Sequence, residues 1–589
     1  MDRWTELAAQ WGIESGYYDV HGQHHETDDE TLRRVVEGLC EPGSPPASTH
    51  PQPRQPQPAY QGDGRCVWVL AVQLYAVRSR RNWGHGDFTD LARLLELVAS
   101  LGGAGIGLNP LHAQFYDRAD CSGSPYAPNS RLFINPLYID VEAIEEFQPV
   151  HIEAVTDDIA RLRGGDLVDY PKVATLKLVA LRNAYFAFAA HGSIERRVDF
   201  DAYRKERGRE LESFAAFETL RGQHVGAWWD WPEPWRKPDK EALRCLRHDQ
   251  PDEIAFHEFL QWNAERQLAR CHDIACRHGL SIGLYLDTAI GVDAGGADAW
   301  IEQGNVLRGL SIGAPPDHFN PAGQDWGLTA YNPHGLVANN FEPFRQMLRA
   351  AMRYAGAVRV DHVLGLMRLF VIPRGFPPSH GAYLRFPFDD MLAVVAEESR
   401  RWTCIAVGED LGTVPENLRP MLAAWGVWSY LVTLFERNWD GSFRRPADYP
   451  HRAVATFNTH DLPTFAGWMT GHDLRTKRAI GVDPGETDEE RHRSRRALDA
   501  AVKAHNGTQN VGFEDVVAFL AATPTRLVSL AVEDVLDIAD QINVPGTVAQ
   551  YPNWRRRWPL ALEEIASDQR LPRIAATLAR AGRGSAPES

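Results

Sequence analysis

The chain has 589 residues and a formal net charge of -16, with 44% hydrophobic and 24% charged residues. This composition is typical of soluble globular proteins, and the length predicts either several domains or one barrel with large insertions. The negative charge disfavours nucleic acid and anionic membranes as partners, because both attract basic surfaces. A neutral ligand such as a sugar is compatible with this charge.

The N-terminus and the cysteines bear on where the protein is found. The opening segment MDRWTELAAQWGIESGYYD is polar and amphipathic and has no apolar core of the kind found in signal peptides. No run of eighteen apolar residues occurs, so we expect no membrane span. The seven cysteines are scattered and odd in number, which is typical of free thiols in a reducing compartment. We therefore expect a cytoplasmic protein.

One short segment has the residue types of a metal site. Cys271, His272, Cys276 and His278 lie within eight residues, in a stretch whose apolar residues have helical spacing. No second ligand pair follows at a zinc-finger spacing. We interpret the segment as a helix with buried thiols, and we expect no metal.

The first part of the chain differs from the rest. Residues 1–41 predict a small helical unit, because TDDE at 27–30 matches a capping box and TLRRVVEGLC follows with helical spacing. Residues 42–62 are rich in proline and polar residues, which predicts a linker. The main domain is expected over 63–589.

From residue 65 onward, short apolar runs alternate with helical patterns, which indicates parallel strands. About eight such runs favour a (β/α)₈ TIM barrel. The structural rival is a doubly wound open sheet, which the lack of a GxGxxG motif after the first run disfavours only modestly. The runs cover 66–77, 104–111, 281–287, 357–361, 404–410, 427–435, 453–461 and 526–534.

The alternation fails between the second and third runs. Residues 150–280 are mostly helical in pattern, and the stretch is too long for a loop. We expect a helical subdomain, over about 142–280, inserted into the barrel.

At least four of the apolar runs end in or beside an acid. In a barrel, the carboxyl ends of the strands meet at the mouth where chemistry is built. A single acid there could equally cap the following helix. Four of them, with Arg359 two residues before one and His460 beside another, favour catalysis. The acids are Asp287, Asp361, Glu409 and Asp461.

Such a set fits glycoside chemistry, in which one carboxylate attacks the anomeric carbon and a protonated one donates to the leaving oxygen. Arg359 and Asp361 are two residues apart on a strand and so share a face, where the guanidinium would keep Asp361 ionised. A desolvated position would raise the pKa of Glu409, so that it could act as the general acid.

The chain also has 18 Trp. Most of these would fill a core, but those in loops, such as Trp326, could stack on sugar rings.

Several long segments, in order, resemble the 4-α-glucanotransferases of the amylomaltase type (glycoside hydrolase family 77), especially the longer bacterial members with an N-terminal extension. The resemblance runs from the first helix to nearly the C-terminus. The segments are LYAVRSRRNWGHGDFTDL (74–91), NPLHA (109–113), SPYAPNSRLFINPLYIDV (124–141), GAPPDHFNPAGQDWGL (313–328), VRVDHVLGLMRLFVIP (358–373), GEDLGTVP (408–415), THDLPT (459–464) and YPNWRRR (551–557).

The resemblance implies a role for each matching residue. Asp361 resembles the nucleophile, Glu409 the general acid/base, and Asp461 the third acid, which binds sugar hydroxyls and stabilises the transition state. The other matches are the flanking Arg359 and His460, Asp287 and Tyr126 on the donor side, and Gln324 and Trp326 on a flexible loop over the site. The family uses no metal and no organic cofactor.

The resemblance also implies a retaining double displacement on maltooligosaccharides, glycogen or starch-like glucans, with loop 313–328 keeping water out. An α-glucan hydrolase would share the three acids, and a non-catalytic glucan-binding protein would not need them intact. One departure is Asn458, where many members carry a small residue before THD.

Overall fold

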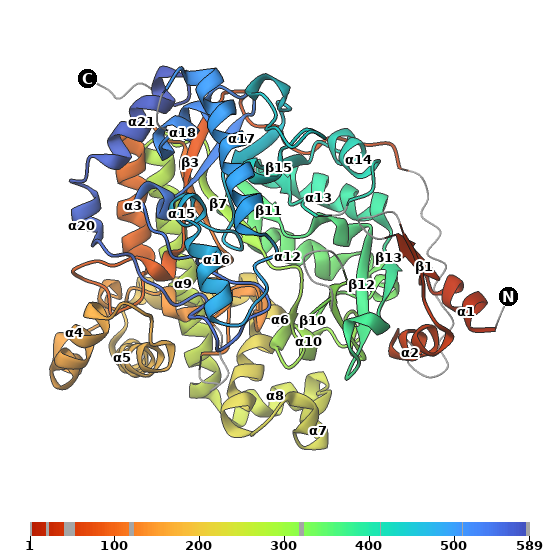
Figure 1. Ribbon diagram of the computed structural model, residues 1–589. Coiled ribbons are helices and arrows are strands. Elements are labelled where there is room, and N and C mark those ends of the chain that lie inside the picture. The colour runs from red at the N-terminus through yellow and green to blue at the C-terminus, as the bar shows by residue number, and fades with distance from the viewer. Residues whose placement is uncertain are drawn as a thin grey trace.

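The computed structural model describes residues 3–18, 23–39, 54–116, 123–316, 323–412, 414–508 and 511–584. Its centre is a closed barrel of parallel strands in the order β11-β14-β15-β16-β17-β3-β4-β7 (Figure 1). In chain order the strands are β3 (Val67–Val72), β4 (Gly105–Leu108), β7 (Gly283–Thr288), β11 (Ala357–Val360), β14 (Ile405–Gly408), β15 (Trp428–Val432), β16 (Ala453–Thr456) and β17 (Leu527–Ala531).

Each of the eight predicted runs coincides with one barrel strand, although β7 extends one residue beyond its run, so the predicted (β/α)₈ fold is confirmed. The strands are shorter than the runs, because several apolar runs continue into the loops at the barrel mouth. The first run, 66–77, becomes β3 and then a 3₁₀ turn at Leu74–Ala76. The run 453–461 ends as a strand at Thr456, which puts Asp461 in the following loop rather than at the strand end.

Helices connect and cover most of the strands (Figure 1). No α-helix lies between β15 and β16, which are joined by described chain with only 3₁₀ turns. The connecting helices are α3 (Phe88–Ser100), α9 (Pro251–Arg277), α10 (Ala297–Ile301), α11 (Pro333–Ala338), α12 (Glu342–Met352), α13 (Phe388–Trp402), α14 (Leu418–Ala424), α15 (Phe465–Thr470), α16 (His472–Ala479), α17 (Asp488–Asn506) and α18 (Phe513–Ala521), followed after β17 by α19 (Val532–Val535), α20 (Leu562–Ile565) and α21 (Arg570–Arg580).

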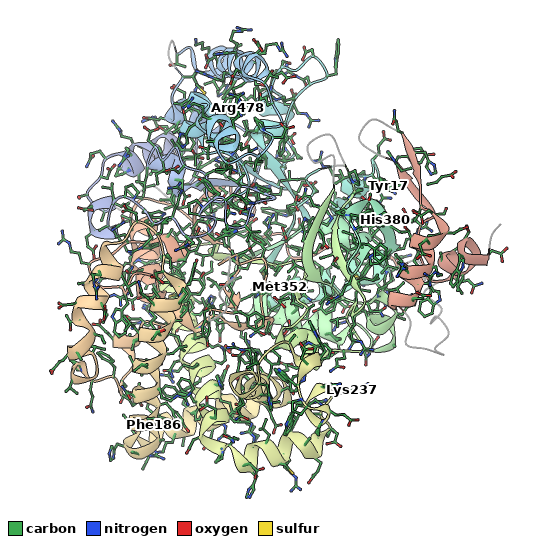
Figure 2. The ribbon with its side chains drawn as sticks, turned by 60° about the horizontal axis from the view of Figure 1, so that its bottom comes forward. Tyr17, Phe186, Lys237, Met352, His380 and Arg478 are labelled. Carbon is green, nitrogen blue, oxygen red and sulfur yellow. The ribbon has the colours of Figure 1, made fainter. Side chains whose placement is uncertain are left out.

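The stretch between β4 and β7 is largely helical, and Figure 2 shows Phe186 and Lys237 on it, away from Arg478 on α16. Its last helix, α9, packs against both α6 and the barrel helix α3. The helices before α9 are α4 (Thr156–Gly164), α5 (Tyr170–His191), α6 (Ile194–Gln223), α7 (Glu233–Arg236) and α8 (Lys240–Asp249).

Within the described residues, α5 is the one helix whose length and apolar composition would let it cross a bilayer. Its side chains argue for packing inside the protein. Lys177, near its middle, is buried and donates hydrogen bonds to the carbonyls of Leu137 (2.6 Å) and Ile139 (2.9 Å). Because α5 buries a lysine side chain against other parts of the same protein, we interpret it as a core helix.

A second, antiparallel sheet stands beside the barrel, and the sequence did not predict it. Its strand order is β13-β12-β9-β10-β8. All five strands follow β7 or β11 in the chain, so the sheet is built from loops of the barrel mouth. The strands are β8 (Val292–Asp293), β9 (Leu310–Ala314), β10 (Gln324–Thr329), β12 (Arg368–Pro373) and β13 (Ala382–Arg385).

The N-terminal segment packs on this sheet, at the right of Figure 1. It contains α1 (Arg3–Gln10) and α2 (Asp29–Leu39), and also an unpredicted hairpin of β1 (Gly16–Tyr18) and β2 (His24–Glu26). Glu14 accepts from Arg368 of β12 (3.0 Å) and Arg385 of β13 (2.9 Å). Of the predicted linker 42–62, residues 42–53 lie outside the described residues. In its described part, the N–H of Ala59 donates to the carbonyl of Trp425 (2.8 Å), the residue that ends the barrel helix α14.

Candidate active site

Strand register brings a buried arginine against three acids. β7 and β11 pair with Asp287 directly opposite Arg359. The Arg359 Nη1 lies 2.8 Å from both Asp287 Oδ2 and Asp361 Oδ1, and its Nη2 lies 4.0 Å from Glu409 Oε2. The guanidinium of Arg359, on β11, therefore lies close to acids at the ends of β7, β11 and β14. The sequence had predicted that Arg359 and Asp361 share a face of the strand.

Glu409 is held by the backbone at the end of β14. Its carboxylate accepts the N–H of His362 at Oε2 (2.9 Å) and that of Leu411 at Oε1 (2.8 Å). His362 adopts the left-handed conformation with φ 45°, an unusual backbone state for a residue with a side chain. This strained turn directs its N–H at the acid.

Burial dominates the protonation of Glu409. Desolvation, with the nearby charge of Asp361, raises its pKa to about 7, although Arg359 and the two backbone hydrogen bonds act in the opposite direction. A carboxyl group with a pKa near 7 can give up and recover a proton at neutral pH. The environment therefore suits Glu409 to general acid and base work.

Asp287 has a different environment. Burial raises its pKa, and Asp361 adds to the effect, while Arg359 and Tyr126 oppose it. Its Oδ2 accepts the phenol of Tyr126 at 2.6 Å and its Oδ1 accepts the N–H of Thr288 at 2.9 Å. The carboxylate is thus engaged by protein donors and is placed to orient a ligand rather than to attack one.

Asp461 lies in the loop after β16, beside a cluster of aromatic rings. His460 stacks on Tyr126 with ring centroids 4.6 Å apart, and its Nε2 is 3.4 Å from Asp461 Oδ2. Desolvation alone would raise the pKa of Asp461, but His460 and the hydrogen bond from Asn543 (2.6 Å) outweigh it and lower the pKa. With 46% of its side chain exposed, Asp461 stays ionised and accessible to a ligand.

Three residues that hold this side of the site were not singled out from the sequence. Gln541 donates to the carbonyl of Asp461 (2.9 Å), Asn543 donates to its side chain, and Trp554 lies 5.2 Å from the His460 ring. All three come from the irregular chain after α19, where no periodic pattern exists. The one sequence signal was YPNWRRR, whose tryptophan is Trp554.

Asn458, which the sequence marked as unusual, is buried and structural. Its Nδ2 donates to the carbonyl of Pro463 (3.0 Å) and lies 3.4 Å from Asp534 Oδ1. It closes the turn that carries Thr459, His460 and Asp461, and so fixes the position of that turn.

Gln324 and Trp326 were predicted on a flexible loop, but the structure places them on a strand, with Trp326 beside His362. Both are on strand β10, which pairs with β9 through Gln324 opposite Ala314; residues 317–322 of the predicted loop lie outside the described residues. The indole of Trp326 donates to Gln324 (3.2 Å) and sits edge-on to His362 at 5.5 Å. It therefore stands beside the turn that positions Glu409.

A pocket that is partly open to solvent reaches this cluster; Tyr126, Asp287, Arg359 and His460 all line it. Three further lining residues have buried polar atoms with no protein partner, namely Gln73 Oε1, Tyr285 OH and Glu533 Oε2. Polar atoms left unpaired inside a cavity suit a ligand rich in hydroxyls or bound water.

The suspected metal residues do not form a site. Cys271 is buried and its thiol faces the carbonyl of Phe88 (3.1 Å), whereas Cys276 is exposed. The contact between Cys276 Sγ and His272 Nε2 (3.5 Å) joins two adjacent turns of α9. Over the described parts of the chain, no group of three or more His, Cys, Asp or Glu side chains could hold a metal ion.

A family profile and several known proteins with similar sequences share one description. A family profile described as 4-alpha-glucanotransferase, of glycoside hydrolase family 77, matches residues 72–562. The 4-alpha-glucanotransferase of Mycobacterium tuberculosis is 38% identical over 559 residues, covering 89% of this chain and 75% of that protein. That of Haemophilus influenzae is 35% identical over 555 residues, covering 88% and 79%.

Solved structures agree on the architecture. The crystal structure of amylomaltase from Corynebacterium glutamicum matches with a TM-score of 0.83 and 26% identity, covering 98% of this chain and 99% of that one. The amylomaltase of Streptococcus agalactiae in complex with acarbose matches with a TM-score of 0.74 over 88% of this chain and 100% of that one. At 19% identity, the second likeness supports the fold alone.

Proposed function

Because the chain belongs to the 4-alpha-glucanotransferase family, we propose that it cleaves an α-1,4-glucan and transfers the released segment to another sugar. The observation that supports the proposal is the cluster around Arg359, whose guanidinium nitrogens lie 2.8 Å from Asp361 Oδ1 and 4.0 Å from Glu409 Oε2, with burial raising the pKa of Glu409 to about 7. Glycoside chemistry needs two carboxyl groups at one site, one that attacks the sugar and one that gives a proton to the leaving oxygen.

In the first step, we infer that Asp361 attacks the anomeric carbon while Glu409 protonates the leaving oxygen. The geometry around Arg359 supports this division of roles, because its guanidinium contacts the carboxyl group of Asp361 at 2.8 Å but lies 4.0 Å from that of Glu409. Asp461, ionised and accessible, is placed to bind sugar hydroxyls as positive charge develops on the ring. The bond between the two sugars breaks as the bond to Asp361 forms.

In the second step, the sugar hydroxyl of an acceptor gives its proton to Glu409 and attacks the glycosyl-enzyme. The acceptor attacks the anomeric carbon from the face opposite to Asp361, which is the face that the leaving glucan occupied. The bond to Asp361 breaks, and the two successive inversions retain the α-configuration. Transfer requires that the acceptor compete with water. Trp326, beside His362, is the side chain we propose for shielding the intermediate.

We further propose that the substrates are maltooligosaccharides, glycogen or starch-like glucans, and that the protein acts in the cytoplasm. The five described cysteines, Cys66, Cys245, Cys271, Cys276 and Cys404, are all free thiols, which is typical of a reducing compartment. The net charge of -16 does not hinder a neutral glucan.

Incubation with maltotriose tests the reaction itself. We expect glucose together with a ladder of longer maltooligosaccharides and little gain in reducing ends, because transfer makes one glycosidic bond for each one broken. Chromatography of the products and a reducing-end assay on the same samples give both quantities. A steady rise in reducing ends without longer products would establish hydrolysis instead.

Replacing Trp326 by alanine tests the shielding role. Loss of a stacking indole should weaken acceptor binding by about 1.4 kcal/mol, which is roughly tenfold in affinity. Water would then capture a larger share of the intermediate, so the ratio of hydrolysis to transfer should rise. Trp326→Phe, which keeps an aromatic ring, should change the ratio less.

Glucose release and chain-length redistribution are measured in one reaction for each variant. A fall of both activities with an unchanged ratio would mean that Trp326 only packs β10 against the turn at His362, and it would rule out shielding.

A further inference from the structure

A small hairpin rises from the barrel mouth directly after β15. β15 pairs with β14 and β16, the strands followed by Glu409 and by the Asp461 loop. The chain then forms a 3₁₀ turn at Thr433–Phe435 and reverses with Arg437 bridged to Phe443 in antiparallel fashion. The hairpin therefore begins between the two segments that carry catalytic acids.

The tip of this hairpin is tightly built. The N–H of Gly441 donates to the carbonyl of Asn438 (3.0 Å), and the N–H of Asn438 to the carbonyl of Ser442 (2.8 Å). Asp440 accepts the N–H and the hydroxyl of Ser442 (2.9 and 2.6 Å), and Gly441 takes φ 82°. This is a turn closed by a glycine in the left-handed conformation, a common hairpin connection. Below it, the Arg437 guanidinium lies 4.1 Å from the Phe443 ring centroid.

The remaining residue of the tip is Trp439, and it is 100% exposed. The turn does not need it, because Asn438, Asp440 and Gly441 supply the residue types that turns favour. An indole in water contributes nothing to the core and gives up the burial for which tryptophan is suited. Phe435, at the base of the same segment, is 51% exposed. Two exposed aromatic rings therefore lie between the end of β15 and the tip of the hairpin.

We propose that Trp439 is a remote stacking platform for the part of an α-1,4-glucan chain that extends beyond the catalytic pocket. The proposal rests on the proposed function, since it needs a polymeric substrate held at the same mouth. The apolar face of a glucose ring can stack on a flat indole. The polar side chains of the tip form hydrogen bonds with one another, so Trp439 would bind the glucan by stacking alone. Any glucose unit along the chain could then occupy this position.

The occupant follows from the position of the hairpin. A glucan longer than the cavity must leave it over the rim formed by the loops after the barrel strands. The Trp439 tip belongs to one of these loops, between the loops of Glu409 and Asp461. A protein partner would need a broad apolar patch, whereas the exposed neighbours of Trp439 in the hairpin are the polar Asn438 and Asp440.

Trp439→Ser tests the platform through its dependence on chain length. We expect kcat/KM for amylose to fall roughly tenfold, mainly through KM, the equivalent of about 1.4 kcal/mol. We expect the three rings of maltotriose to stay within the catalytic pocket, so its disproportionation should be unchanged. Trp439→Phe should recover most of the loss. The matched control is Trp229→Ser in the helical insertion, a tryptophan that is 41% exposed, which should leave both substrates unaffected.

Native electrophoresis through gels containing soluble amylose measures binding independently of turnover. Wild type and the Trp229 variant should be retarded more strongly than Trp439→Ser, even if the catalytic proposal fails. Equal retardation of all variants, or an equal loss of kcat/KM on amylose and maltotriose, would overturn the platform. A wild-type enzyme that is retarded by amylose but hydrolyses maltotriose would refute the transfer reaction and leave the platform standing.

Discussion

Asp361→Asn should lower the turnover of maltotriose by at least about 10⁴-fold, the order of loss seen when a covalent nucleophile is removed. The amide has the shape of the carboxylate but cannot form the glycosyl-enzyme. Arg359 keeps its contact with Asp287 at 2.8 Å, so the side chain should stay in place. The kcat of disproportionation and the melting temperature are the two measurements.

Glu398→Gln is the matched control for loss of a buried acid. Glu398 lies on α13, outside the site, and pairs with Arg345 (3.1 Å) and Arg349 (3.2 Å). Its replacement should lower the melting temperature and leave kcat unchanged. A folded Asp361→Asn variant that retained more than about 1% of wild-type kcat would be incompatible with a nucleophilic role.

Glu409→Gln should lower the rate of transfer from natural glucans by about 10²- to 10⁴-fold, because no proton reaches the leaving oxygen. Fluoride leaves without a proton, so α-maltosyl fluoride should still glycosylate this variant. The expected result is fluoride release by Glu409→Gln and none by Asp361→Asn. If Glu409→Gln folds normally and gains nothing from the fluoride donor, another group must be the acid.

The same acid should set a limit in the pH profile. Burial raises the pKa of Glu409 to about 7, so the protonated form needed for the first step is lost as pH rises through this value. For wild type, kcat/KM on maltotriose should therefore decline above about pH 7, while fluoride release from α-maltosyl fluoride by Glu409→Gln should lack this limb. A wild-type profile that stays flat well into the alkaline range would contradict Glu409 as the acid.

The barrel was predictable because its strands are buried on both faces and so read as continuous apolar runs, as VWVLAV of β3 does. The five-stranded sheet was not. β10 (QDWGLT) alternates half-buried and exposed residues and contains Gly327, and β8 has only two residues. Their pairing depends on distant segments, which local patterns do not encode.

The position of the acids around the barrel mouth was also predictable, since each lies at or after a recognisable strand. Their environment was predictable only in part. The pairing of Arg359 with Asp361 follows from strand periodicity, whereas its bond to Asp287 depends on the register between β7 and β11. Asn543 and Gln541 reach Asp461 from irregular chain whose path is set by contacts such as Tyr551 OH to the Gln541 carbonyl (2.7 Å). No spacing in the sequence reveals such contacts.

Mass spectrometry of Glu409→Gln after reaction with α-maltosyl fluoride tests the central claim most directly. Without Glu409 as base, an acceptor sugar cannot be deprotonated, so the glycosyl-enzyme should accumulate. The predicted result is one maltosyl group per chain, located by peptic digestion on the peptide that contains Asp361 and missing from the Asp361→Asn, Glu409→Gln double variant. A maltosyl group on any other residue, or rapid fluoride release with no labelled protein, would contradict Asp361 as the nucleophile.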